Sequence, residues 1–227
     1  MTEELAADLR LGGRLGSGAM GSVWQAEDLT TGKTVAVKTI LHEQINNPDL
    51  RKRFEREAQV CLRLKNPHAV HTSRYGISPA GTPFLVMELL AGTDLTHLIE
   101  IKGPLDLSRC EQLVAQICSV LEEAHGLGVV HRDIKPDNIF LTETEPNLFV
   151  KVLDFGIAKL FEHSAVGTLV TGTGMVIGTP GFMSPEQTFS SKNVDFRSDL
   201  YSLALVTYYA LTGHVAFEEA DDKLPPW

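Results

Sequence analysis

The sequence predicts an α+β fold in two parts, and three observations support this prediction. Up to about residue 90, short runs rich in valine and threonine indicate strands, with one helical pattern among them. Beyond that point the apolar residues recur mostly at helical spacing. No repeat or low-complexity linker interrupts the chain. We therefore expect a lead-in over residues 1–8, a small β-rich lobe with one helix over 9–90 and a mainly helical lobe over 91–227.

Composition argues against several classes of protein. With 227 residues, 43% hydrophobic and 22% charged, the chain can bury one large core or two smaller ones. Its net charge of −9 argues against nucleic acid or an anionic membrane surface as a partner. Three cysteines without a close C-x-x-C pair favour a reducing, cytoplasmic setting. The acidic start and the lack of a long apolar run predict neither a signal peptide nor a membrane segment.

Two short runs, residues 22–27 and 34–40, predict a hairpin. A Thr-Gly-Lys turn around Gly32 joins them. Because side chains alternate along a strand, Lys38 shares one face with Ala36. We expect the Lys38 side chain to lie among apolar neighbours.

A helix is expected from Asp49 to Lys65, where apolar residues recur at steps of four and three. Glu57 falls inside that apolar stripe. A carboxylate there costs free energy unless a cation pairs with it, and Lys38 is the nearest inward-facing candidate upstream. The alternative is a glutamate that extends from the edge of the stripe into water, and these residues alone leave both interpretations open.

Short strands are expected in and after the middle of the chain. Residues 84–87 predict a buried strand, and Gly92 interrupts the pattern that follows, which suits a hinge between the lobes. Further β-type runs occur at 129–130, 139–141 and 150–153.

Two long helices are expected in the second lobe. The first is amphipathic and should end at Gly126 or Gly128, with core packing as the role of at least Cys118. The stretch from Leu200 to Gly213 contains no charge, which predicts a second helix buried on most of its sides.

Residues 16–21 form a G-x-G-x-x-G pattern, which alone fits either a dinucleotide-binding fold or a kinase loop. A dinucleotide fold needs a helix that begins at the third glycine, whereas residues 22–26 continue as a strand. The pattern therefore predicts a hairpin over a ligand, whose glycines let main-chain amides approach phosphate oxygens.

Three further motifs follow in order along the chain. They are Val35-Ala36-Val37-Lys38, His131-Arg132-Asp133-Ile134-Lys135-Pro136-Asp137-Asn138 and Asp154-Phe155-Gly156. With the glycine pattern, they match the protein-kinase signatures in order and spacing. From Leu9 to Phe217 the chain resembles a Hanks-type serine/threonine protein kinase, most closely the bacterial eukaryotic-like group. The resemblance implies a bilobal protein-kinase-like fold and ATP-dependent phosphorylation of serine and threonine hydroxyls on proteins.

The resemblance also implies how the nucleotide is held. In phosphoryl transfer the protein mainly positions groups and neutralises charge. Lys38 would hold the α and β phosphates of ATP, oriented by Glu57. Asp154 and Asn138 would hold Mg2+, with Mn2+ as an alternative, because these hard cations prefer oxygen ligands.

At the reacting end, the resemblance implies that Asp133 receives or orients the proton of the substrate hydroxyl and that Lys135 contacts the γ-phosphate. It implies ATP contacts from the glycine loop, the adjoining strands, the gatekeeper position, the hinge and an acidic ribose contact. These residues are Gly16, Ser17, Gly18, Gly21, Val23, Ala36, Lys38, Met87, Glu88, Leu90 and Asp94. For the apolar residues of this set, ordinary packing of the strands would explain their burial as well as contact with the nucleotide does.

The segment Asp154–Glu186 resembles an activation segment that closes on Ser184-Pro185-Glu186, a serine variant of the family's usual Ala-Pro-Glu. An arginine that pairs with a phosphothreonine would order this segment. The expected regulatory residues are Arg132, Thr171 and Thr173. Thr179 resembles the threonine of the substrate-docking loop.

Residues 218–227 depart from the family. They show neither helical periodicity nor the arginine that the family pairs with the glutamate placed like Glu186, so the chain resembles a C-terminally truncated kinase domain. In the family, later helices partly cover the helix expected over Leu200–Leu211, so we expect exposed apolar surface on that helix and self-association through it. Two functions stay open: an active signalling kinase that acts on protein serine and threonine, and an ATP-binding, catalytically weak module that acts through partners.

Overall fold

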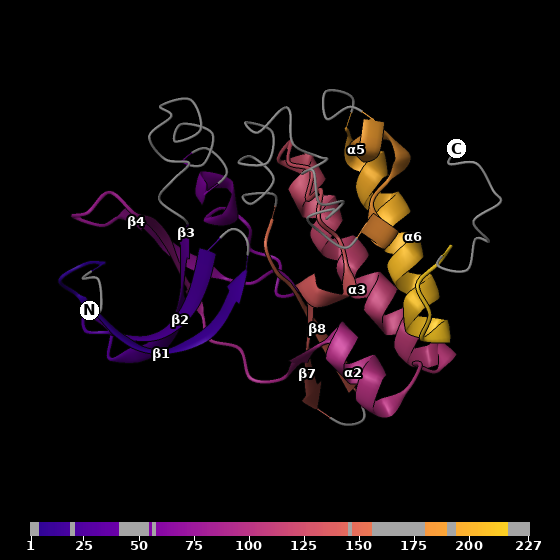
Figure 1. Ribbon diagram of the computed structural model, residues 1–227, viewed down its shortest axis with the longest axis horizontal. Helices are drawn as coiled ribbons and strands as arrows, with labels where there is room; N and C mark the ends of the chain where they lie inside the picture. The colour runs from indigo at the N-terminus through magenta and orange to yellow at the C-terminus, as the bar shows by residue number, and fades with distance from the viewer. Residues whose placement is uncertain are drawn as a thin grey trace, which may run out of the picture. The chain divides into compact units, whose positions relative to one another are not determined.

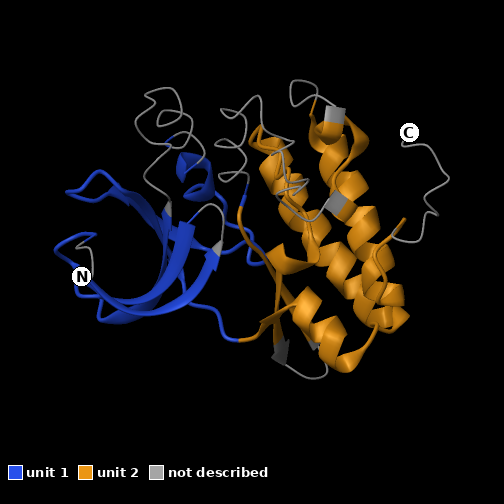
Figure 2. Ribbon diagram, in the orientation of Figure 1, with its two compact units in different colours: residues 1–91, 155–164 blue, residues 92–154, 165–227 orange. Residues whose placement is uncertain are grey.

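The structure, a computed structural model, describes residues 5–18, 21–40, 55, 58–144, 147–155, 180–189 and 194–217. The chain divides into two compact units, residues 1–91 with 155–164 and residues 92–154 with 165–227 (Figure 2). The first unit holds a five-stranded sheet. The second holds a three-stranded sheet and most of the helices (Figure 1).

An antiparallel sheet with the strand order β1-β2-β3-β5-β4 forms the first unit. Its strands are β1 (Leu9–Gly18), β2 (Gly21–Asp28), β3 (Lys33–Ile40), β4 (Thr72–Ile77) and β5 (Pro83–Glu88). The predicted hairpin is confirmed as β2 and β3, and the predicted buried strand as β5. Gly32 in the connecting turn has φ 68°, a conformation that glycine adopts without the steric cost it has for other residues.

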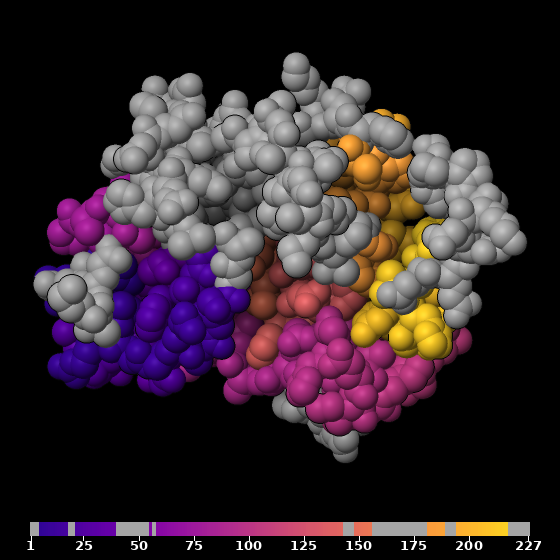
Figure 3. Space-filling view, viewed as in Figure 1, coloured from indigo at the N-terminus to yellow at the C-terminus, as the bar shows by residue number. Residues whose placement is uncertain are grey.

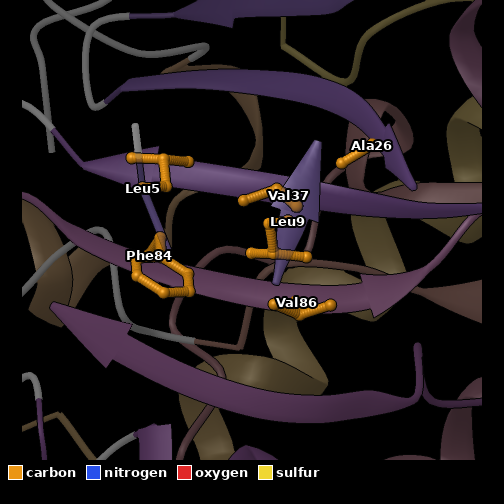
Figure 4. Close-up of a cluster of buried hydrophobic side chains, with 6 residues drawn as sticks. All are labelled: Leu5, Leu9, Ala26, Val37, Phe84 and Val86. Carbon is orange, nitrogen blue, oxygen red and sulfur yellow. The ribbon is translucent and has the colours of Figure 1, made fainter. Parts of the chain in front are cut away.

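One face of this sheet packs on a small apolar core. Its members come from β1, β2, β3, β5 and the residues before β1, and each is at most 7% exposed. They are Leu5, Leu9, Ala26, Val37, Phe84 and Val86 (Figure 4). Because successive side chains point to opposite faces, Lys38 lies on the face opposite Val37.

The helix predicted over 49–65 is described only at its end. Residues 58–61 are helical. Ala58, Cys61 and Leu64 are buried, in agreement with the predicted apolar stripe.

The second unit combines a small sheet with four helices among its described residues. The sheet has the order β6-β7-β8, with β6 (Thr93–Asp94), β7 (Ile139–Thr144) and β8 (Asn147–Val152). The helices are α2 (Leu95–Lys102), α3 (Leu107–Gly126), α5 (Pro185–Phe189) and α6 (Phe196–Thr212). The β run expected at 139–141 is confirmed within β7, and that at 150–153 is confirmed in β8 up to Val152, where the strand ends. The run expected at 129–130 is wrong, because those two residues lie in no strand.

Gly92 directly precedes β6, the first strand of the second unit. It has φ 148°, and a Cβ atom there would lie 2.1 Å from the main-chain oxygen of Leu141. No side chain fits that space, so glycine is required at this position.

Helix α3 ends at Gly126 as predicted and presents one apolar face to the core. The buried residues of that face recur at steps of three and four: Cys110, Leu113, Ile117, Val120, Leu121 and Ala124. The expectation of core packing for Cys118 is wrong, since its side chain is exposed and Cys110 is the buried cysteine of this helix. Cys118 follows Ile117 directly, so it falls outside the helical stripe.

Side chains of α3 also cover the open edge of the small sheet. Gln116 Nε2 donates to the carbonyl of Leu148 at 2.8 Å, and Gln116 Oε1 accepts from the N–H of Val150 at 2.8 Å. Gln112 Oε1 accepts the N–H of Leu148 at 3.2 Å. These bonds satisfy main-chain groups of β8, which would otherwise be an unpaired edge.

Helix α6 begins after Asp195, whose side chain accepts the N–H of Arg197, and ends at Gly213 in a left-handed cap. The prediction of burial on most sides is only partly right. Four large side chains of the helix are between 36% and 47% exposed: Leu200, Tyr201, Tyr208 and Leu211. The atoms of this helix, yellow in Figure 3, reach the surface of the unit. Among the described residues, no helix is both long enough and apolar enough to cross a membrane.

Candidate active site

The described residues of the glycine pattern lie at the end of β1 and the beginning of β2, which pair as a hairpin. Gly16, Ser17 and Gly18 at the end of β1 pair with Val23, Ser22 and Gly21 of β2 respectively. This arrangement agrees with the predicted hairpin rather than with the strand-to-helix turn of a dinucleotide-binding fold.

Four of the predicted nucleotide contacts share one face of the first unit's sheet. Lys38 is paired with Val23 across β2 and β3, and Ala36 is paired with Met87 across β3 and β5. Directly opposed residues of an antiparallel pair lie on the same face, as do residues two apart on one strand. The register therefore brings Val23, Ala36, Lys38 and Met87 together on the face opposite the apolar core.

The expected hinge residues lie at and after the end of β5. The Glu88 N–H donates to the carbonyl of His71 at 3.0 Å, and the Glu88 carboxylate accepts the N–H of His71 at 2.7 Å. Leu90 is half-buried beyond the strand. In the second unit, Asp94 is the N-cap of α2, because its Oδ1 accepts the N–H of His97 at 2.8 Å. This carboxylate thus has a structural role whether or not it contacts a ribose.

Three predicted catalytic side chains meet in the loop between α3 and β7. Lys135 Nζ lies 3.1 Å from Oδ2 of Asp133. Asn138 Nδ2 donates at 2.8 Å to the same Oδ2 and at 2.8 Å to the main-chain oxygen of Asp133. Two donors on one oxygen fix the rotation of the carboxylate, so the loop presents Asp133 in one orientation.

Asn138 fits the role of a cation ligand. Its two side-chain bonds to Asp133 both use Nδ2, which turns the planar amide so that Oδ1 points away from Asp133. An amide oxygen is a ligand of the kind that Mg2+ takes in proteins. The N–H of Leu153 donates to the main-chain oxygen of Asn138 at 2.9 Å, which ties this ligand to the chain just before Asp154.

Asp199, which the sequence analysis did not identify, holds the main chain of this loop. Its carboxylate is fully buried. Oδ2 accepts from His131 N–H and from His125 Nε2, each at 2.8 Å, and Oδ1 accepts from Arg132 N–H at 2.7 Å. A buried carboxylate is stable only when such donors compensate its lost hydration. The sequence signal was an aspartate immediately before the uncharged stretch that begins at Leu200.

The main chain on both sides of the site is strained. Arg132 has φ 65° and Asp154 has φ 57°, values that side-chain-bearing residues adopt at a cost of about 1–3 kcal/mol. His131 supports the loop between them, since its Nε2 lies 2.8 Å from the main-chain oxygen of Leu153 and its Nδ1 accepts the N–H of Asp133 at 3.3 Å. Strain of this kind persists where the surroundings hold it and is common at functional sites.

Glu186 has a partner within the second unit. The buried hydroxyl of Ser198, in the first turn of α6, donates to Oε1 of Glu186. This hydrogen bond is the largest of the causes that lower the pKa of the Glu186 carboxyl.

Several predicted residues lie outside the described part of the chain. They are Glu57, Thr171, Thr173 and Thr179. The Lys38–Glu57 ion pair and the phosphorylation sites therefore stay predictions.

Comparison with known proteins agrees with this arrangement. A family model described as "Protein kinase domain" matches residues 9–225. The chain is 40% identical to serine/threonine-protein kinase pkn3 of Myxococcus xanthus over 94% of this chain and 39% of that protein. It is 40% identical to serine/threonine-protein kinase PknB of Mycobacterium tuberculosis over 95% of this chain and 36% of that protein. The chain thus spans less than half the length of these curated relatives.

Solved structures agree with the sequence comparison. The PknI kinase domain of Mycobacterium tuberculosis superposes with a TM-score of 0.74 at 25% identity, covering 95% of this chain and 79% of that one. Rad53 in complex with AMP-PNP superposes with a TM-score of 0.74 at 28% identity, covering 95% of this chain and 51% of that one. The chain therefore has the protein kinase fold and belongs to the protein kinase domain family.

Proposed function

We propose that the chain transfers the γ-phosphoryl group of ATP to serine and threonine hydroxyls of proteins. The observation that carries the proposal is the shared contact of Lys135 and Asn138 with the Asp133 carboxylate, in a loop held by buried Asp199. The curated relatives named above are serine/threonine-protein kinases. The alternative is a catalytically weak ATP-binding module. This alternative is not favoured, because the described part of the site has no feature that distinguishes it from the site of an active kinase.

In this proposal Asp133 orients the attacking hydroxyl and accepts its proton. Its carboxylate is held by two side chains of the same loop, so little reorganisation is needed when the substrate arrives. Lys135 lies beside that carboxylate and is placed to contact the γ-phosphate, whose oxygens carry charge through the transition state.

Lys38 is proposed to contact the α and β phosphates and to pair with Glu57. The face that it shares with Val23, Ala36 and Met87 would contact the adenine end of the nucleotide. Lys38 would bind the phosphates, while its apolar neighbours would contact the adenine ring of the same nucleotide. The bound phosphates would also compensate the charge of a lysine that lies among apolar side chains. Gly16, Ser17, Gly18 and Gly21 would cover the phosphates with main-chain amides, and Glu88, Leu90 and Asp94 would contact the adenine and ribose.

Asn138 and Asp154 are proposed to hold Mg2+, with Mn2+ accepted in its place. The orientation of the Asn138 amide supports the first assignment. When bound, the cation would neutralise phosphate charge that otherwise repels the incoming hydroxyl.

Control and partners form the finer part of the proposal. Arg132 would pair with phosphorylated Thr171 or Thr173, and Thr179 would contact the protein substrate. We place the reaction in cytoplasmic signalling, where free cysteines such as buried Cys110 persist as thiols. The exposed side chains of α6 are proposed to support self-association, which light scattering of the purified chain measures.

Transfer of labelled phosphate tests the proposal. The purified chain, γ-labelled ATP, Mg2+ and casein should yield label on serine and threonine of casein. Label should fall to background with chelator and return with Mg2+ or Mn2+. Equal labelling by the intact chain and by Asp133→Asn would instead attribute the activity to a contaminant.

A further inference from the structure

Helix α5 contacts the catalytic loop through the side chain of Gln187. Its Nε2 donates to the main-chain oxygen of Arg132 at 2.6 Å, across a separation of 55 positions in the sequence. That oxygen belongs to the peptide group joining Arg132 to Asp133. Gln187 therefore binds the main chain directly before the proposed catalytic base.

Ser184 determines which end of the Gln187 amide faces the loop. Gln187 Oε1 accepts the N–H of Ser184 at 3.1 Å and its hydroxyl at 3.3 Å. Ser184 is fully buried. Because a carbonyl oxygen only accepts and an NH2 group only donates, these two donors turn the NH2 end toward the Arg132 oxygen. An alanine at position 184 would keep the main-chain donor but would lose the hydroxyl.

Gln187 binds the peptide group that follows Arg132, a residue whose main chain is strained. Arg132 has φ 65°, a conformation that residues with a Cβ atom rarely adopt. Its N–H is held by Asp199 Oδ1 at 2.7 Å, and its carbonyl is held by Gln187. With the Gln187 bond removed, the peptide between Arg132 and Asp133 is still held by the long 3.3 Å bond from the Asp133 N–H to His131 Nδ1. The peptide can then rotate more easily, and this rotation acts against the bonds from Lys135 and Asn138 that orient the Asp133 carboxylate.

We propose that Gln187, oriented by Ser184, is a positioning residue for Asp133 and makes the geometry of the catalytic loop depend on the docking of α5. The inference rests on the proposed function for its effect on turnover. Its effect on the order of the loop is independent of any activity.

The chain offers a matched control in Gln116. This glutamine also lies on a helix, donates through Nε2 to a main-chain oxygen at 2.8 Å and accepts a main-chain N–H through Oε1. Its partners are in β8 rather than in the loop that carries Asp133. Loss of its bonds should therefore reduce stability without redirecting Asp133.

The test compares Gln187→Met, Gln187→Glu and Gln116→Met with the unaltered chain. Glutamate keeps the length of glutamine and its acceptor oxygen but replaces the NH2 donor by a second oxygen, which cannot donate to the Arg132 carbonyl. Both Gln187 variants should lower kcat about tenfold to hundredfold while the KM for ATP stays within about twofold, as expected for a misplaced reacting group. Hydrogen exchange of the peptide covering residues 131–135 should become about tenfold faster. Gln116→Met should lower Tm and leave both quantities near those of the unaltered chain.

Two results would overturn the inference. One is unaltered kcat and unaltered exchange at 131–135 in both Gln187 variants. The other is an equal loss of kcat in Gln116→Met, which would reduce Gln187 to a general stabilising role. If the unaltered chain transfers no phosphate, the proposed function fails. The hydrogen exchange of residues 131–135 in the Gln187 variants then tests by itself whether Gln187 orders the loop. If Gln187→Met does not fold, Gln187→Glu supplies the same comparison.

Discussion

Asp199 accepts the main-chain N–H of Arg132 at 2.7 Å, a bond between residues 67 positions apart. With the bonds from His131 and His125, it gives one buried carboxylate three donors. The loop that carries Asp133 is thus attached to the first turn of α6.

Replacement of Asp199 by asparagine should destabilise the fold and slow phosphate transfer. One carboxylate oxygen of Asp199 would become an NH2 group that faces a main-chain N–H, so two donors would meet without an acceptor. A buried donor left without an acceptor costs about 1–3 kcal/mol. Thermal unfolding and kcat measure the two effects. Asp195→Asn is the control, because asparagine caps a helix as well as aspartate does and the Asp195–Arg197 pair is exposed. Equal effects of the two variants would contradict the role given to Asp199.

Replacement of Ser198 by alanine should lower stability in a pH-dependent way. The Ser198 bond lowers the pKa of Glu186, so its stabilisation is complete above the unfolded value near 4.5 and is lost as the pH falls through the folded value. The free energy of unfolding should fall by about 1–2 kcal/mol at pH 7, and the difference should shrink below the unfolded value.

Urea unfolding between pH 3 and pH 7 measures this difference. Thr207→Val is the control, because the Thr207 hydroxyl donates to the Leu203 carbonyl, which does not titrate. A Ser198→Ala effect that stays constant over this range would mean that the Glu186 carboxyl is not its source.

Replacement of Lys38 by methionine should weaken ATP binding. A charged hydrogen bond to phosphate contributes about 1.5–3 kcal/mol, so the Kd for ATP should rise at least about tenfold. Calorimetric titration with ATP and Mg2+ measures this change. Lys33→Met, an exposed lysine at the start of the same strand, should leave the Kd unaltered. Normal ATP affinity and activity in Lys38→Met would refute the assigned phosphate contact.

Thr171 and Thr173 should carry phosphate after incubation with ATP. Both lie in the segment that precedes α5, where Thr171 adjoins Gly172 and Thr173 lies between Gly172 and Gly174, and a phosphate there could pair with Arg132. Mass spectrometry locates the phosphates, and Asp133→Asn tests whether the chain itself adds them. If the chain is fully active and carries phosphate only outside residues 154–186, phosphorylation of these two threonines does not control its activity.

The strands and the long helix were predictable because their signals are local. Alternation over residues 34–40 predicted which face Lys38 occupies, and the steps of three and four along α3 predicted its buried face. The same periodicity, applied strictly, places Cys110 inside that face and Cys118 outside it. The error over Cys118 came from treating a small apolar residue as buried by its type rather than by its position on the helix.

Motifs singled out the loop of residues 131–138, which we propose to be catalytic, but not the side chains that hold it. Asp199 and Gln187 reach that loop from 67 and 55 positions away, and no local spacing links them to Arg132. Asp199 also precedes an uncharged stretch, where it resembles an ordinary residue of a helix's first turn. Only the packing of α5 and α6 around the loop brings these side chains to the Arg132 peptide.

In the proposed function, Asp133 serves the chemical step rather than the binding of ATP. Replacing it by asparagine keeps its size but removes the base, and such groups contribute about 10²- to 10⁴-fold to rate. The direct measurement is kcat for phosphate transfer beside the Kd for ATP, in the unaltered chain and in Asp133→Asn. We expect kcat to fall by about 10²- to 10⁴-fold in Asp133→Asn, with the Kd for ATP unchanged within about twofold. Equal losses of affinity and turnover would contradict it.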